Sequence, residues 1–196
     1  MRNTLFISAI IAVTATVAVV ACTTSAAKNE KVTAAVTQDS LIRRGSYLVT
    51  TMVCDDCHSP KQMGPHGPEL VPGRRLSGYN SANPVPHIDT NQVKNGWILF
   101  GPDLTLAVGP WGASFAANLT SDSTGIGAWK EEQFLTAIRH GKLKGLDGNR
   151  GILPPMPWEN FSKASDEDLK AIFAFLKSTK PVHNIVPAPK AFSELK

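Results

Sequence analysis

The 196-residue sequence has little net charge, few cysteines and no apolar run that clearly reaches membrane-spanning length. Its formal charge of +4 is too small an excess to indicate a nucleic-acid partner. The apolar run Leu5–Ala21 is shorter than the about 20 residues that a spanning helix needs, and threonines interrupt it. These absences leave one domain of ordinary size that follows an N-terminal targeting segment.

Cysteine occurs only three times, at Cys22, Cys54 and Cys57. A zinc site would need two further Cys or His ligands at matching spacing, and Cys22 lies in the targeting segment. A redox dithiol of the thioredoxin type opens a helix after a strand, whereas the residues before Cys54 have a helical pattern. Neither function fits the cysteine pair well.

The pair is followed directly by His58, which completes the sequence Cys-Asp-Asp-Cys-His. Cys-x-x-Cys-His is the attachment sequence of c-type haem. On a helix, positions i, i+3 and i+4 share a face, so both sulfurs can reach one edge of the porphyrin while the imidazole lies under the iron. The sequence predicts one covalent haem c, bound through Cys54 and Cys57, with His58 as the proximal iron ligand.

The N-terminus has the features of an exported protein. Arg2 precedes the apolar run, so residues 1–21 are interpreted as a signal peptide. The sequence Val-Val-Ala-Cys ending at Cys22 resembles a bacterial lipobox, in which the cysteine is lipidated and anchors the protein to a membrane. The alternative is an ordinary cleavage nearby. Residues 22–38 lack an apolar period and are predicted to be a flexible tether with a reach of roughly 20 Å.

Residues 39–187 are assigned to the main domain and 188–196 to a C-terminal tail. Apolar residues at helical spacing predict a helix from Asp39 to the haem motif, in which Gly45 indicates a close crossing with another helix. Two more helices are expected, one from 130 to 140 and one that begins after Ser165. Residues 59–116 form a long Gly/Pro-rich insertion, expected to be irregular apart from a short strand or hairpin.

Met156 is the methionine best suited to bind the iron opposite His58. Pro155 and Pro157 flank it, which stiffens the loop and removes competing backbone donors. Met52 lies on the same helix as the motif, and Met63 is only about 17 Å of extended chain from His58. Histidine at the sixth position is the other possibility, although no histidine has a comparably rigid setting.

Three groups of residues carry a resemblance to a known family. They are Asn118-Leu119-Thr120 with Thr124-Gly125-Ile126-Gly127 and Trp129, Met156-Pro157-Trp158, and Ser165-Asp166-Glu167-Asp168-Leu169. In this order they resemble the class I cytochrome c family, in particular the haem domains of cytochrome subunits of membrane-bound alcohol and gluconate dehydrogenases. Those subunits usually carry three haem motifs, whereas this chain has one.

The resemblance implies an all-α class I cytochrome c fold, with three to five helices around one haem. It also implies that Met156 is the distal ligand. Gly67-Pro68-Glu69-Leu70 resembles the segment in which a proline carbonyl accepts a hydrogen bond from the proximal histidine, so Pro68 is expected in that role. Leu70 and Leu76 are expected to line the haem. Arg74 and Arg75 either pair with its propionates or are simply exposed.

The expected function is electron transfer between redox partner proteins outside the cytoplasm, without an enzymatic reaction. The partner is a dehydrogenase or lies on the side of a terminal oxidase. The alternative is a haem peroxidase or a gas sensor, either of which needs an iron position that Met156 does not permanently occupy. The sequence predicts no nucleic-acid binding.

Replacing Cys22 tests the lipid anchor. Cys22→Ser should release the protein from membranes into the periplasm, or leave an unprocessed precursor, because the acylated side chain is lost. Membrane fractionation with palmitate labelling measures this. A wild-type protein found wholly in the soluble fraction, without label, contradicts lipidation.

Overall fold

The computed structural model describes residues 37–195. The predicted signal peptide, Cys22 and the tether as far as residue 36 lie outside the described residues. None of the helices between residues 37 and 195 is both long enough and apolar enough to cross a membrane.

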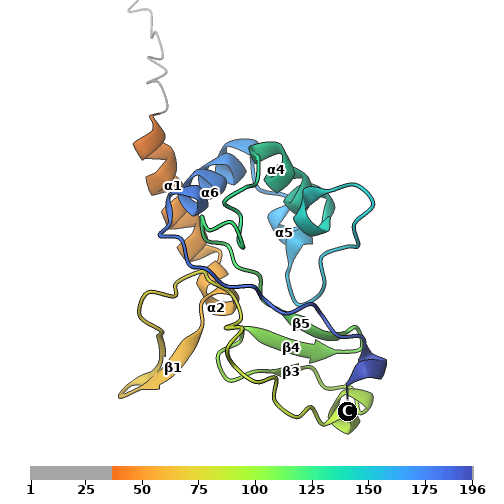
Figure 1. The fold of residues 1–196 in the computed structure, drawn as a ribbon. Coiled ribbons are helices and arrows are strands. Elements are labelled where there is room, and N and C mark those ends of the chain that lie inside the picture. Colours follow the sequence, from red (N-terminus) through yellow and green to blue (C-terminus); the bar gives the residue numbers. More distant parts are fainter. Residues whose placement is uncertain (1–36, 196) are drawn as a thin grey trace, which may run out of the picture. The chain divides into compact units, whose positions relative to one another are not determined.

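The first and the last elements of the described chain are helices, and the strands come between them in the sequence (Figure 1). The elements are α1 (Gln38–Thr51), α2 (Cys54–His58), β1 (Lys61–Gly64), β2 (Gly67–Leu70), α3 (Thr90–Lys94), β3 (Leu99–Phe100), β4 (Leu106–Gly109), β5 (Gly112–Phe115), α4 (Glu131–His140), η1 (Leu143–Gly145), α5 (Trp158–Phe161), α6 (Asp166–Ser178) and η2 (Phe192–Glu194).

The prediction of an all-α class I cytochrome c fold is wrong. The structure contains two antiparallel sheets, a β1–β2 hairpin and a sheet in the order β3-β4-β5, and helices account for only 36% of the described residues. Both sheets lie in residues 59–116, which were expected to be mostly irregular. The reason lies in the turns, where Gly67 and Gly112 have φ values of 123° and 102°. Glycine accepts such angles, so the chain reverses tightly and the flanking residues pair.

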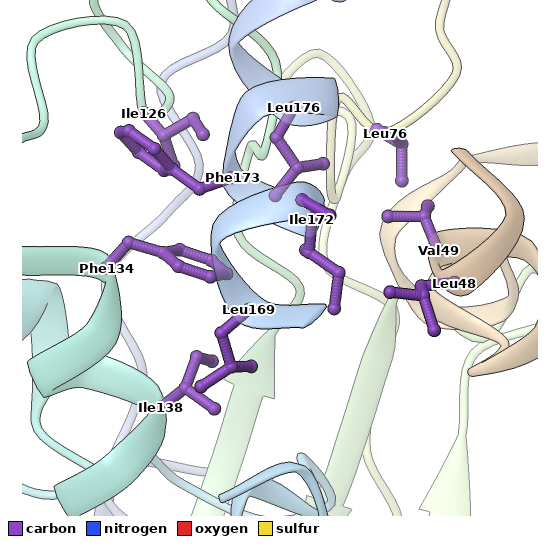
Figure 2. Packing of buried hydrophobic residues seen from close by; sticks show 11 residues of the cluster. Leu48, Val49, Leu76, Ile126, Phe134, Ile138, Leu169, Ile172, Phe173 and Leu176 are labelled. Atoms are coloured by element: carbon purple, nitrogen blue, oxygen red, sulfur yellow. The ribbon is translucent and has the colours of Figure 1, made fainter. Parts of the chain in front are cut away.

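A helical core is formed where α6 lies between α1 and α4 (Figure 2). Phe134 of α4 stacks on Phe173 of α6 with ring centroids 5.4 Å apart. The buried residues of the helical core are Leu48, Val49, Leu76, Ile126, Phe134, Ile138, Leu169, Ala171, Ile172, Phe173 and Leu176. Three helices and two connecting segments therefore share one apolar interior.

The predicted helices α4 and α6 are confirmed, together with the residues that begin or end them. Ser165 Oγ accepts the N–H of Asp168 at 3.1 Å, which caps α6, and Gly141 ends α4 with a φ of 59°. Helix α1 starts slightly earlier than expected, because the cap is Thr37 and not Asp39.

A second apolar cluster lies on the three-stranded sheet. Tyr79 packs edge-on against Phe115 with ring centroids 4.8 Å apart. The C-terminal residues, expected to be a tail, reach this sheet. The backbone of Lys190 pairs with that of Ala113, and Leu195 is buried in the cluster. The last residues thus help to hold the sheet.

Gly45 lies at the crossing of α1 and α6, as its place in the sequence predicts. A Cβ atom at this position would lie 1.9 Å from the carbonyl oxygen of Ala171 and 2.7 Å from Cβ of Phe175. Contacts this short are not tolerated, so the two helix backbones approach closely only because residue 45 has no side chain.

Gly45→Ala should therefore lower the free energy of unfolding by about 1–3 kcal/mol, the usual cost of overpacking. This sign is opposite to the gain of about 1 kcal/mol that alanine gives in an unhindered helix. Urea unfolding followed by circular dichroism measures the change. Arg43→Ala, on the exposed face of the same helix, is the control and should change stability by less than about 0.5 kcal/mol. Equal stability of Gly45→Ala and wild type would contradict the close crossing.

Candidate functional site

The Cys-x-x-Cys-His motif forms its own short helix, α2, which is separated from α1 by Met52 and Val53. Val53 has φ 53° and ψ 32°, a left-handed conformation that is unusual for a β-branched residue. A single helix through the motif was expected, and the structure breaks it at this residue. Within α2 the positions of Cys54, Cys57 and His58 still share one face.

The ring of His58 is held by a backbone carbonyl. Nδ1 lies 2.8 Å from the carbonyl oxygen of Ala117. Because a carbonyl can only accept, Nδ1 carries the proton and Nε2 keeps its lone pair. Burial of the ring lowers the pKa of His58, and this outweighs the opposing effects of Ala117 and Asp55. A neutral imidazole with a free Nε2 is the form that binds metals.

Residues 76–79 join the motif to the segment that supplies this carbonyl. The N–H of Gly78 donates to the carbonyl of His58 at 2.7 Å, and the N–H of Tyr79 donates to that of Ala116 at 2.9 Å. Gly78 has a φ of 75°, and a Cβ atom there would lie 2.6 Å from the carbonyl oxygen of Ala117. A glycine is needed here to bring the Ala117 carbonyl to His58.

The residue after Ala117 is a buried asparagine that fixes the local backbone. The Nδ2 group of Asn118 donates to the carbonyl of Val182 at 2.8 Å. Its Oδ1 accepts from the N–H and the hydroxyl of Thr120 at 3.0 and 2.8 Å. The hydrogen bonds of Asn118 fix the backbone of the Asn-Leu-Thr segment, and with it the position of the adjacent Ala117 carbonyl.

A salt bridge and a hydroxyl fix the side of α2 that carries Asp55. Arg75 Nη2 and Nε lie 2.7 and 3.0 Å from the two oxygens of Asp55. Ser59 Oγ donates to Asp55 at 2.7 Å and accepts the N–H of Leu76 at 2.8 Å. Burial tends to raise the pKa of Asp55, but the hydrogen bonds from Arg75 and Ser59 outweigh it and hold the pKa below its usual value.

The two cysteines are half-buried thiols that do not resemble a redox pair. Burial, with the nearby charge of Asp55, raises the pKa of Cys54 to about 11, and burial raises the pKa of Cys57. A redox-active dithiol has a lowered pKa. Among residues 37–195, no three His, Cys, Asp or Glu side chains gather as they would around a metal ion.

Met156 lies in the Met156 loop (residues 153–157), just before α5. Its half-buried side chain packs against the helical core, as does that of Cys54. Met63 lies on β1 with its side chain 80% exposed, and Met52 caps the C-terminus of α1. The fold thus brings the side chains of Cys54 and Met156, which are 102 positions apart, to the same apolar core.

Pro68 and Leu70 lie on β2 and are exposed. His58 donates to Ala117 and not to the predicted Pro68. The reason is that residues 67–70 pair with β1. That Leu70 lines the haem stays a prediction. Leu76 is fully buried in the helical core, and its contact with a haem stays a prediction. Sequence reasoning missed Ala117, because a backbone carbonyl has no signature in residue type.

These residues fit a covalently bound haem. They supply two thiols and a neutral imidazole on one short helix, and a thioether beside an apolar core. Arg75 is taken by Asp55, but Arg74 Nη1 is buried without a hydrogen-bond partner among the described residues. A buried guanidinium nitrogen is costly unless an anionic group meets it, and haem carries two propionates.

Several known proteins with similar sequences are cytochrome subunits. The cytochrome c subunit of gluconate 2-dehydrogenase from Pantoea cypripedii is 29% identical over 154 residues, which are 78% of this chain and 25% of that protein. The cytochrome subunit of fructose dehydrogenase from Gluconobacter japonicus is 29% identical over 76% of this chain and 23% of its own length. No family model matches the chain.

A shorter stretch is more similar to a third protein. The cytochrome c subunit of quinone-dependent alcohol dehydrogenase from Gluconacetobacter polyoxogenes is 40% identical over 75 residues, 37% of this chain and 15% of that protein. The chain spans at most about a quarter of the length of these relatives. The similarities confirm the resemblance to cytochrome subunits of alcohol and gluconate dehydrogenases.

Removing Arg75 tests the salt bridge on α2. Arg75→Met should lower the free energy of unfolding at pH 7 by about 1 kcal/mol, because solvent screens this half-exposed pair. The pKa of Asp55 is depressed in the folded state, so its contribution is present above the unfolded pKa of about 3.9 and is lost as the pH falls below it. The difference between variant and wild type should therefore shrink at pH 3.

Urea unfolding at both pH values measures this difference. Arg43→Met is the matched control, because Arg43 is exposed on α1 and makes no ion pair among the described residues. A difference for Arg75→Met that stays the same at pH 3 and pH 7 would show that its cause is lost packing against Phe175 and not the charge pair.

Proposed function

We propose that this chain is a c-type cytochrome that carries single electrons between partner proteins, through one haem attached at Cys54 and Cys57. The observation that carries the proposal is the hydrogen bond from His58 Nδ1 to Ala117, in a Cys-x-x-Cys-His motif. It leaves Nε2 as the one unprotonated nitrogen of the ring. The similarity to cytochrome c subunits of dehydrogenases supports the same function.

Each residue of the site has a separate task. When bound, haem supplies a one-electron ferric/ferrous couple. Cys54 and Cys57 would hold the group permanently through thioethers, and His58 Nε2 would bind its iron. The helical core keeps water away, and a medium of low dielectric disfavours the additional charge of ferric iron. No side chain needs to move a proton during electron transfer.

Met156 completes the proposed ligand set. Its position between two prolines and its packing against the helical core support this role. A thioether is a soft ligand that stabilises ferrous iron and raises the reduction potential relative to two histidines. With Met156 and His58 both bound, the iron would have no free position for a substrate or gas, which would distinguish a carrier from a haem peroxidase or a gas sensor.

The proposed location is the periplasmic side of a bacterial membrane. The N-terminal apolar run and the Val-Val-Ala-Cys sequence at Cys22 support export and lipid anchoring. The relatives are subunits of gluconate, fructose and alcohol dehydrogenases, so the proposed electron donor is a dehydrogenase. The one Cys-x-x-Cys-His motif of this sequence supports a single redox site.

Met156→Ala tests the ligand and, with it, the function. The variant should keep its covalent haem but lose the methionine-to-iron charge-transfer band at the red edge of the ferric spectrum. Its reduction potential should fall by on the order of 0.1 V, within the about 0.8 V that axial ligands span. The reduced variant should bind carbon monoxide, whereas the reduced wild type should not. Optical spectroscopy and redox titration measure all three.

Met63→Ala is the control, because Met63 is exposed on β1 and should leave these properties unchanged. If the two variants behaved the other way round, Met63 would be the ligand. Binding of carbon monoxide by the reduced wild type would favour the sensor or peroxidase function over the carrier.

A further inference from the structure

The three-stranded sheet is bonded to the Met156 loop at one point. Ser114 Oγ, on β5, donates to the carbonyl of Pro154 at 2.7 Å. Trp111 Nε1 donates to the same hydroxyl at 3.3 Å, and the carbonyl of Ala107 lies farther away, at 3.4 Å. A hydroxyl has a single proton. The short distance to Pro154 and the donor at Trp111 together direct that proton toward the Met156 loop.

The Met156 loop makes few other hydrogen bonds to the rest of the described chain. Pro154, Pro155 and Pro157 have no N–H to donate. The N–H of Trp158 bonds back to the carbonyl of Met156 within the same segment. Among the hydrogen bonds of the described residues, the one from Ser114 is the only one that ties residues 153–156 to an element outside residues 141–161.

We propose that Ser114 is a positioning residue that keeps Met156 bound to the iron, and that the three-stranded sheet acts as a brace for the Met156 loop. This inference rests on the proposed ligation by Met156. The side chain of Met156 reaches its ligand position from a loop whose backbone is fixed to the sheet by one hydrogen bond. Loss of that bond increases the fraction of molecules in which Met156 is displaced.

Competition with imidazole measures that fraction. An added ligand binds ferric iron only where Met156 has left, so its apparent affinity is proportional to the population without Met156. Losing one hydrogen bond changes such a population by about fivefold. We therefore expect Ser114→Ala to bind imidazole about fivefold more tightly than wild type, and the charge-transfer band to disappear at lower temperature.

Two further variants of the full-length haem-bound protein make the test specific. Ser114→Thr keeps the hydroxyl and should restore wild-type imidazole affinity. Ser178→Ala removes a hydroxyl that donates to the carbonyl of Phe175 on α6 at 2.7 Å, remote from the Met156 loop in sequence. It should leave imidazole affinity unchanged. Hydrogen exchange of peptides covering residues 152–158 should be faster in Ser114→Ala alone.

The outcomes separate this inference from the proposed function. A wild-type ferric protein without the charge-transfer band would overturn ligation by Met156 and the brace with it. If that band is present and Ser114→Ala binds imidazole as Ser178→Ala does, the brace alone is wrong. Tighter binding in both Ser114→Ala and Ser114→Thr would also overturn it, because the hydroxyl would not be the cause.

Discussion

The hydrogen bond from His58 Nδ1 to the carbonyl of Ala117 joins segments that are 59 residues apart, and the polar interior is arranged around it. Gly78 fits between the two segments because it lacks a Cβ atom. The buried Asn118 and Asn184 hold the surrounding backbone, and the latter donates to the carbonyls of Ser77 and Tyr79. These buried side chains donate to or accept from the surrounding backbone. Moving the Ala117 carbonyl would break some of these hydrogen bonds and so cost free energy.

The hydrogen bond between His58 and Ala117 also links the three-stranded sheet to the Cys-x-x-Cys-His motif. The segment that ends at Ala117 is the continuation of β5, so the strands lead directly to the carbonyl that orients His58. The start of β5 is paired in turn with the C-terminal residues through Ala113 and Lys190. The three-stranded sheet therefore contributes to the proposed haem site through its backbone, which leads to Ala117, and through the hydroxyl of Ser114, which bonds to the Met156 loop.

Most of the helical framework and of the chemistry could be predicted from residue types. Cys54, Cys57 and His58 are recognised by spacing, α4 and α6 by period and caps, and Gly45 by its cost within a helix. These features are local, because each depends on neighbours within a few positions. The sheets were largely missed, since strands of two to four residues give too short a period to distinguish from loops. The prediction for Pro68 failed because residues 67–70 pair with β1. The acceptor is instead the backbone carbonyl of Ala117, a group that any residue can supply.

The sequence by itself determined which groups are available: two thiols and an imidazole on one turn, a methionine between prolines, and an apolar run near the N-terminus. The tertiary structure decided how they are used. It selected Ala117 as the partner of His58, assigned Arg75 to Asp55, and placed Cys54 and Met156 against one apolar core. The physical reason is that covalent and helical relations are fixed by short spacing along the chain. Hydrogen bonds and packing between distant segments depend instead on the whole balance of burial and polar satisfaction.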